Sequence, residues 1–155
     1  MTIYSLLAMF LGTATIGSAL ANDAALKKLA FKMTSEMASF REGAKVGIRP
    51  FFKHEVNMDP VAAERLYEKI YTAFNDVKDM VGFQYIDQRN IMALLQTREE
   101  FYMGDPTALL QEAQADLQII CKPQQKIDGL SLSCVASDLY SGTTYSTQEI
   151  FFNFD

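Results

Sequence analysis

The residues of this sequence best suited to chemistry are two cysteines, Cys121 and Cys134, and a single histidine, His54. Two thiols and one imidazole exclude a four-thiolate zinc site. His54–Met58 begins like a zinc-protease motif, but the second histidine that this motif needs is missing. No Gly-x-Ser-x-Gly motif accompanies the histidine, and no glycine-rich phosphate loop is present. The sequence therefore predicts a protein that is not an enzyme and that has no metal and no cofactor.

Cys121 and Cys134 lie in two segments of alternating apolar residues, which are separated by Asp128-Gly129, a pair typical of hairpin turns. A tight turn near Ile127 and Asp128 would place the two cysteines opposite each other on adjacent strands. In an oxidising compartment they could then form a disulfide. A register shift of two residues would separate them and leave two small buried side chains. Both alternatives stay open at this point. No Cys-x-x-Cys motif indicates thiol oxidoreductase activity.

Aromatic residues are numerous for a chain of this length, with 11 Phe and 7 Tyr. Most of them are expected to fill the core. Phe101 and Tyr102 lie in a segment bracketed by charged residues, which favours an aromatic patch on the surface. Together with Phe52, they are the candidate contacts with a protein partner.

Residues 1–21 contain no Asp, Glu, Lys or Arg, and small residues precede a plausible cleavage site after Ala21. This pattern is typical of a secretory signal peptide, and its apolar part is short for a membrane span. The alternatives are a buried N-terminal helix and an uncleaved anchor. Cleavage near Ala21 would leave residues 22–155 as one periplasmic or secreted domain, without a stable membrane span. No cysteine near the site supplies a lipid-attachment signal.

The chain has 155 residues, a net charge of −5 and 49% hydrophobic residues, values that fit one globular domain. Its acidic balance argues against a nucleic-acid partner, which requires clustered Lys and Arg. Asp59-Pro60 and Asp105-Pro106 each combine a helix-capping carboxylate with a proline at the first helical position. Gly82 is expected to end the first of these helices.

Hydrophobic periodicity gives the order α-β-α-β-α-α-β-β-β. This order predicts an α/β sandwich built on one mixed five-stranded sheet. The sheet has one parallel strand–helix–strand crossover and a C-terminal antiparallel meander, with helices packed on it. The expected helices begin near residues 22, 59, 87 and 105. The expected strands cover residues 45–52 and 83–86 and three segments from residue 117 to 154, and residues 98–104 form a connection.

Several segments occur in the order found in a known family of exported domains. Lys45–Phe51 is similar to the first strand of that family, and Phe83–Leu95 is similar to a strand followed by a helix with a Leu-Leu pair. Asp138–Gly142 is similar to its hairpin. On these motifs the chain resembles the family shared by the curli-secretion protein CsgG, the penicillin-binding-protein activator LpoB, the flagellar protein FlgO and the N-terminal domain of TolB.

The resemblance covers residues 22–155 and implies a non-enzymatic periplasmic accessory protein. Such a protein would act in envelope assembly, secretion or peptidoglycan synthesis through contacts with an envelope protein. The alternative is a module that binds a small ligand or a peptidoglycan fragment in a groove at the ends of the parallel strands. An apolar pocket with converging polar groups would favour the alternative, whereas an exposed aromatic patch or a free sheet edge would favour the accessory protein.

Overall fold

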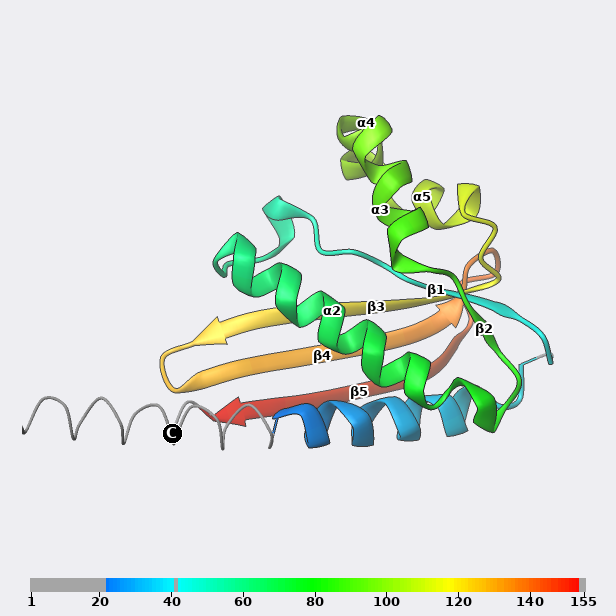
Figure 1. Ribbon diagram of the computed structural model, residues 1–155, viewed down its shortest axis with the longest axis horizontal. Helices are drawn as coiled ribbons and strands as arrows, with labels where there is room; N and C mark the ends of the chain where they lie inside the picture. Colours follow the sequence, from blue (N-terminus) through cyan, green and yellow to red (C-terminus); the bar gives the residue numbers. More distant parts are fainter. Residues whose placement is uncertain (1–21, 41, 154–155) are drawn as a thin grey trace, which may run out of the picture.

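The computed structural model describes residues 22–40 and 42–153 (Figure 1). The predicted signal peptide, residues 1–21, lies outside the described residues. Residues 22–37 are helical and are called the N-terminal helix below. The following elements are β1 (Lys45–Ile48), η1 (Lys53–Glu55), α2 (Pro60–Asp76), η2 (Lys78–Met80), β2 (Gln84–Tyr85), α3 (Gln88–Thr97), α4 (Glu99–Gly104), α5 (Pro106–Glu112), β3 (Leu117–Lys126), β4 (Gly129–Asp138) and β5 (Thr144–Asn153).

Three aspartates start helices, as the sequence predicts. The Asp59 side chain accepts a hydrogen bond from the Ala62 N–H at the start of α2, and Asp105 does the same for Ala108 at the start of α5. Asp87 accepts from the Arg89 N–H before α3. Each carboxylate satisfies an N–H that has no partner within its helix. Beyond α2, Gly82 has a φ of +69°, a conformation that favours glycine and turns the chain into β2.

The sheet has the order β2-β1-β3-β4-β5. The expected crossover is present, since β1 and β2 are parallel and α2 joins them. β1 also runs parallel to β3, while β3, β4 and β5 form the expected antiparallel meander. β1 is shorter than the predicted strand over residues 45–52. The Arg49 N–H still donates to the Ile119 carbonyl of β3 at 2.9 Å, and Pro50, which has no N–H, follows it where the chain leaves the sheet.

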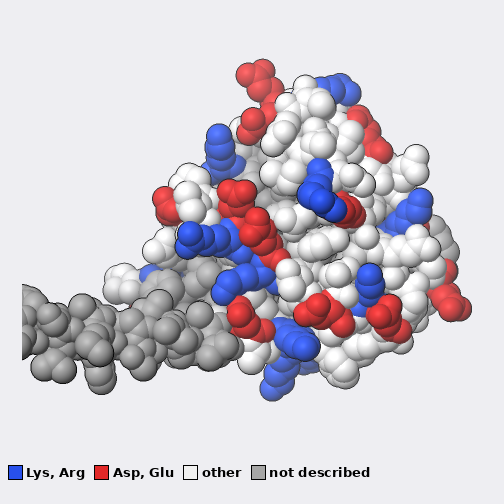
Figure 2. All heavy atoms as spheres, viewed as in Figure 1, with Lys and Arg blue, Asp and Glu red and all other residues white. Residues whose placement is uncertain are grey.

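The N-terminal helix and α2 cover one face of the sheet (Figure 1). Val46, Ile48, Leu117 and Ile119 point from the sheet into this first core, and α2 contributes Phe74 from above. An ion pair between Lys69 and Asp23, 2.9 Å long, joins the two helices at the surface. On this face Lys and Arg are interspersed with Asp and Glu (Figure 2). No helix in the described part of the chain is long and apolar enough to cross a membrane.

The β3–β4 hairpin has the register that a tight turn at Ile127 and Asp128 requires, with Lys126 opposite Gly129. Cys121 is therefore directly opposite Cys134, and the two are joined by a disulfide. Both side chains lie in the first core. The sequence left open a disulfide or two separate buried thiols, and the structure has the disulfide.

Replacing both cysteines, as in C121A/C134A, is expected to destabilise the domain by about 3 kcal/mol, because the cross-link closes a short loop in the unfolded chain. Urea denaturation of the oxidised protein and the variant measures this difference. Wild-type protein kept in dithiothreitol is the matched control and should unfold close to the variant. Equal urea midpoints for all three samples would contradict a stabilising disulfide.

Candidate functional site

The helices α3, α4 and α5 form a unit with a core of its own, beside β1 and β2 (Figure 1). Gly47 of β1 permits this packing, because a Cβ there would lie 2.9 Å from Cδ2 of Leu110 and 3.3 Å from Cβ of Ala115. This second core consists of Phe52, Ile91, Leu95, Tyr102, Leu109, Leu110, Ala115 and Leu139.

Residues 98–104 were expected to be a connection, and this prediction is wrong, because residues 99–104 form α4. Glu99 and Glu100 occupy its first turn, where carboxylates interact favourably with the helix dipole. The Arg98 carbonyl accepts a hydrogen bond from the Tyr102 N–H, 3.1 Å away. Tyr102 then anchors this short helix in the second core. Tertiary packing thus makes a helix of a segment too short to be stable alone.

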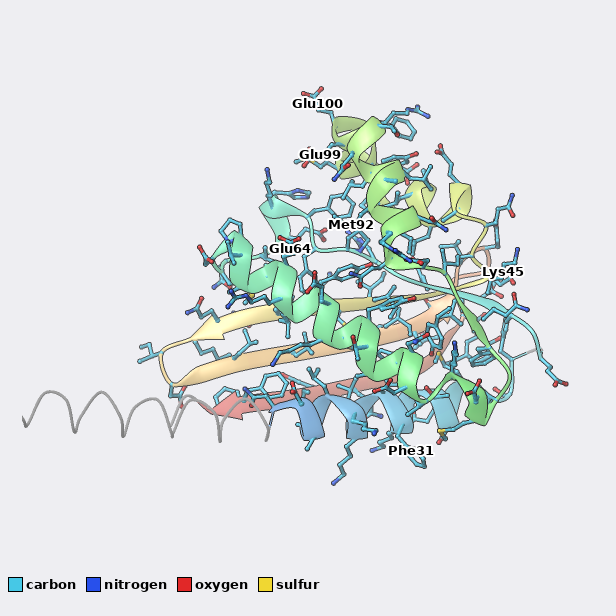
Figure 3. All side chains as sticks on the ribbon, in the orientation of Figure 1. Phe31, Lys45, Glu64, Met92, Glu99 and Glu100 are labelled. Carbon is cyan, nitrogen blue, oxygen red and sulfur yellow. A yellow bond between two sulfur atoms is a disulfide. The ribbon has the colours of Figure 1, made fainter. Side chains whose placement is uncertain are left out.

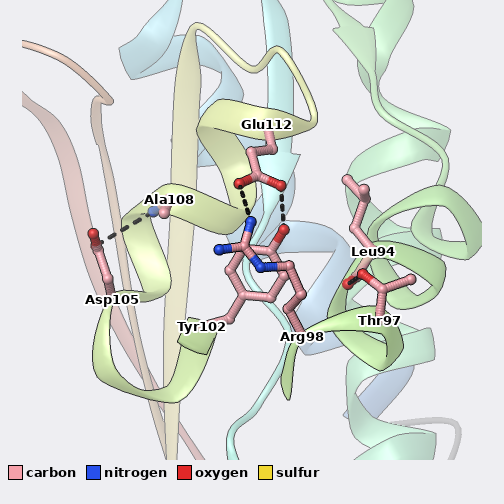
Figure 4. Close-up of polar contacts among 7 residues, drawn as sticks. All are labelled: Leu94, Thr97, Arg98, Tyr102, Asp105, Ala108 and Glu112. Atoms are coloured by element: carbon pink, nitrogen blue, oxygen red, sulfur yellow. Dashed lines mark hydrogen bonds and ion pairs between the residues drawn. The ribbon is translucent and has the colours of Figure 1, made fainter. Parts of the chain in front are cut away.

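Arg98, Tyr102 and Glu112 form a polar cluster between α4 and α5 (Figure 4). The Tyr102 hydroxyl donates a hydrogen bond to Oε2 of Glu112, and Nη1 of Arg98 lies 3.4 Å from Oε1 of the same carboxylate. The hydrogen bond to Glu112 is the main cause that raises the pKa of Tyr102, with burial second. Sequence reasoning missed this cluster. The spacing of Arg98 and Tyr102, four residues apart, was a visible signal, but Glu112 comes from another helix.

Of the three predicted partner contacts, the structure exposes only Phe101, at 46% of its surface. Phe52 is 3% exposed and Tyr102 0%, because both fill the second core, so neither side chain offers surface to a partner. The Arg98 guanidinium lies over the Phe101 ring, 4.2 Å from its centroid. Glu99 and Glu100 project at the same end of the molecule (Figure 3). We call Arg98, Glu99, Glu100 and Phe101 the α4 patch.

The chain between β1 and α2 forms a ridge, residues 49–58, that is held in place at several points. Arg49 forms an ion pair of 2.5 Å with Glu55 and lies over the Phe52 ring. The Asn57 side-chain amide accepts from the Gln125 N–H at 3.0 Å and donates to the Gln125 carbonyl at 3.4 Å. Asn57 thus pairs with β3 as a strand residue would. The zinc-protease-like segment that begins at His54 is part of this ridge and precedes α2, as predicted.

An apolar groove of about 440 Å³ lies on one side of the ridge, at the carboxyl ends of β1 and β2. The Tyr67 hydroxyl at its wall donates to the Ile48 carbonyl at 2.8 Å, and burial raises the pKa of Tyr67. Glu64 and Met92 belong to opposite walls, on α2 and α3 (Figure 3). The residues that shape the groove include Phe51, Val56, Met58, Ala63, Tyr67 and Met92.

A polar hollow of about 490 Å³ lies on the other side of the ridge, on the sheet face opposite the first core. Lys122, Ser133 and Glu149 occupy one row across β3, β4 and β5. The Ser131 hydroxyl donates to Oε1 of Glu149 at 3.0 Å. His54 and Glu55 border the hollow from the ridge. The arrangement can offer hydrogen bonds and both signs of charge to a polar ligand. Among residues 22–40 and 42–153, no three His, Cys, Asp or Glu side chains are grouped to hold a metal ion.

Comparison by fold finds LpoB domains and a lipoprotein. No protein-family model and no curated protein matches the sequence. The structure of the LpoB C-terminal domain from Salmonella enterica has a TM-score of 0.60 at 10% identity, over 83% of this chain and 95% of that chain. The same domain from Escherichia coli has a TM-score of 0.60 at 9% identity, over 82% and 94%. Lipoprotein GNA1162 from Neisseria meningitidis has a TM-score of 0.52 at 12% identity, over 71% and 80%.

At these low identities the likeness concerns the fold alone. It confirms the predicted mixed five-stranded sheet with packed helices, and among the proteins that the sequence motifs resemble it supports a likeness in fold to LpoB. The fold of this protein is therefore similar to that of the LpoB C-terminal domain.

Tyr102 should ionise at a higher pH than a free tyrosine because its proton is held by Glu112. The pKa of the folded state exceeds the unfolded value of about 10, so the hydrogen bond stabilises the fold fully below pH 10. Its contribution is lost as the pH rises through the raised pKa. An ultraviolet difference titration of wild type against Tyr102→Phe isolates this group.

In the same titration, Glu112→Ala should lower the pKa of Tyr102 towards 10. Glu100→Ala removes a nearby exposed carboxylate that makes no hydrogen bond to Tyr102, and it should leave the midpoint unchanged. An unchanged midpoint in Glu112→Ala would refute the role of this carboxylate.

Proposed function

We propose that this chain is a non-enzymatic accessory protein of the cell envelope that acts in envelope assembly, secretion or peptidoglycan synthesis through protein contacts. The observation that carries the proposal is the LpoB-like fold, which extends over 95% of the Salmonella LpoB C-terminal domain. The ordered motifs of the sequence point the same way. The wider kinship with CsgG, FlgO and the N-terminal domain of TolB stays a prediction based on those motifs.

The proposed location is the periplasm or the exterior, after cleavage near Ala21. Two kinds of observation support it. The fold neighbours include a protein described as a lipoprotein, and the cross-link between Cys121 and Cys134 fits an oxidising compartment. The proposed partner is an envelope protein.

The α4 patch is the proposed contact surface. Phe101 is large, exposed and held in one orientation by Arg98, which is itself paired with Glu112. An aromatic ring and an arginine fixed before binding lose little conformational freedom in a complex, and these two residue types dominate interface energetics. Glu99 and Glu100 in the first turn of α4 add negative charge at the same end of the molecule, which suits a partner with basic residues near an apolar pocket.

A photoreactive phenylalanine analogue at position 101 of the full chain, expressed in a Gram-negative bacterium, tests this surface. Irradiation should give a discrete adduct with one envelope protein, identified by mass spectrometry. The purified pair should then bind directly, and Phe101→Ala should weaken binding by about tenfold or more, as expected for a central aromatic contact. Arg98→Ala should weaken it as well.

The analogue at Met80 is the matched control, because this side chain is 43% exposed and lies in η2, outside the α4 patch. It should give no such adduct. Identical adducts from both positions, or unchanged affinity in Phe101→Ala, would refute the α4 patch as the contact surface.

A second candidate function is the binding of a small ligand or a peptidoglycan fragment. The apolar groove lies at the carboxyl ends of β1 and β2, where this alternative was expected. The polar hollow on the other side of the ridge favours it further, because Lys122, Glu149 and two serine hydroxyls converge there. A peptidoglycan fragment carries hydroxyls, carboxylates and an amine, groups that such a lining can pair with.

Calorimetry with a disaccharide tetrapeptide tests the second candidate. Saturable binding that falls about tenfold in Lys122→Ala, as expected for the loss of a charge-assisted hydrogen bond, would support it. Lys27→Ala, which changes a lysine on the other side of the sheet, should leave binding unchanged. The absence of saturable heat with folded protein would exclude this ligand.

A further inference from the structure

One face of the sheet is open over β3, β4 and β5. Cys121 and Cys134 point into the first core, so Ile120 and Val135, the neighbouring pair in the ladder, point to the opposite face. Both are half-buried, and neither belongs to the first or the second core. The second core packs against the sheet at Gly47 of β1. The three strands therefore carry apolar side chains that lie outside both cores of the described domain.

Phe151 is the large aromatic residue of this open face. It is 45% exposed, and its ring rests on Gly129 of β4, where a Cβ would lie 2.8 Å from Cζ of the ring. Gln124, Ser131 and Phe151 form one row across β3, β4 and β5. Gln124 lines the polar hollow beside the ridge, whereas Phe151 does not. The row thus runs from the hollow to a projecting ring.

The neighbouring row carries a charge at each end. Lys122, Ser133 and Glu149 follow one another across β3, β4 and β5, and Lys122 and Glu149 are both exposed. Neither of them forms an ion pair with another residue in the described part of the chain. The open face is therefore positive on β3 and negative on β5.

We propose that the open face binds a second copy of the chain, face to face, about a two-fold axis parallel to β4. This axis places β3 of each copy opposite β5 of the other. Lys122 then meets Glu149 of the second copy, and the same pair occurs twice in the dimer. Phe151 of the second copy lies over Gln124, beside the hollow. The charges and the shape of the face are thus satisfied by one and the same axis.

The charges disfavour a two-fold axis that runs along their own row. Such an axis would put Lys122 opposite Lys122 and Glu149 opposite Glu149 of the second copy, and like charges repel. The axis parallel to β4 instead places Val135 near its own copy, so apolar side chains meet at the centre of the interface. Two sheets that pack face to face lie about 10 Å apart with their strands roughly aligned, which fits this arrangement.

The dimer goes beyond the proposed function and does not depend on it. The α4 patch belongs to the helices beside β1 and β2, whereas the interface uses β3, β4 and β5 (Figure 1). A dimer would thus carry two α4 patches, and a partner with two binding sites would be held more tightly than by one patch. Because the dimer covers the polar hollow, it competes with the ligand of the second candidate function.

Sedimentation velocity of the purified chain over a range of concentrations tests the proposal. Wild type should change from monomer to dimer as the concentration rises. Lys122→Glu and Glu149→Lys should each weaken the dimer by about tenfold or more, because each variant puts two pairs of like charges into the interface. An equimolar mixture of the two variants should dimerise again, since every pair then has opposite charges. The double variant K122E/E149K should dimerise by itself for the same reason.

Variants of the aromatic ring test the shape of the interface. Phe151→Ser should weaken the dimer by about tenfold. Phe31→Ser is the matched control, because Phe31 is 55% exposed but lies on the N-terminal helix. Lys27→Glu is the control for charge, since its side chain borders a groove with Arg65 of α2. Both controls should dimerise like wild type, and circular dichroism checks that each variant is folded.

Three results would overturn the proposal: a wild type that stays monomeric at millimolar concentration, a dimer that neither charge variant weakens, or a mixture of the two folded charge variants that stays monomeric. The first result would leave the open face to the ligand of the second candidate function, and the second would place the dimer interface elsewhere. None of them affects the adduct with an envelope protein expected at Phe101, so failure here is distinguishable from failure of the proposed function.

Discussion

The short strand β1 faces two cores at once, and the arrangement of the domain depends on it. Val46 and Ile48 point into the first core, beneath the N-terminal helix and α2. Between them, Gly47 leaves room for α5 and so for the second core. β1 also has parallel partners on both sides. A side chain at Gly47 would press on Leu110 and Ala115, so the second core beneath the α4 patch would have to shift.

Local rules account for much of the fold. The Asp-Pro pairs correctly predicted where α2 and α5 begin. The Asp128-Gly129 turn predicted a hairpin in which Cys121 lies opposite Cys134, and these two residues form the disulfide. These features depend on residues close in sequence, so periodicity and capping reveal them. The helix α4 was missed because it depends on Tyr102, whose partners come from other elements. Phe52 and Tyr102 were predicted as partner contacts for the same reason: the residues that bury them come from distant parts of the sequence.

The candidate surfaces differ in chemistry, and each suits a different kind of ligand. The α4 patch offers an aromatic ring beside an arginine, the polar hollow offers hydroxyls and charges, and the groove offers apolar side chains. In the structure Phe101 is exposed and Tyr102 is buried. In the sequence they are neighbouring aromatic residues within the same charged segment, so nothing local distinguishes them. A sequence can therefore indicate that a surface aromatic exists before it can indicate which one. A fold shared with LpoB at about 10% identity leaves such surfaces free to differ.

The ridge between β1 and α2 has a consequence for how such a domain can diverge. It separates the apolar groove from the polar hollow. Beyond Phe52, which is buried in the second core, it is fastened by the Asn57 amide and by the ion pair of Glu55 rather than by a ladder of strand hydrogen bonds. An insertion or deletion in its exposed part, between Phe52 and Asn57, would reshape both neighbouring depressions together and leave Phe52 in the second core. Descendants of this protein can therefore acquire new binding preferences through changes in the length of a single loop, at little cost to folding.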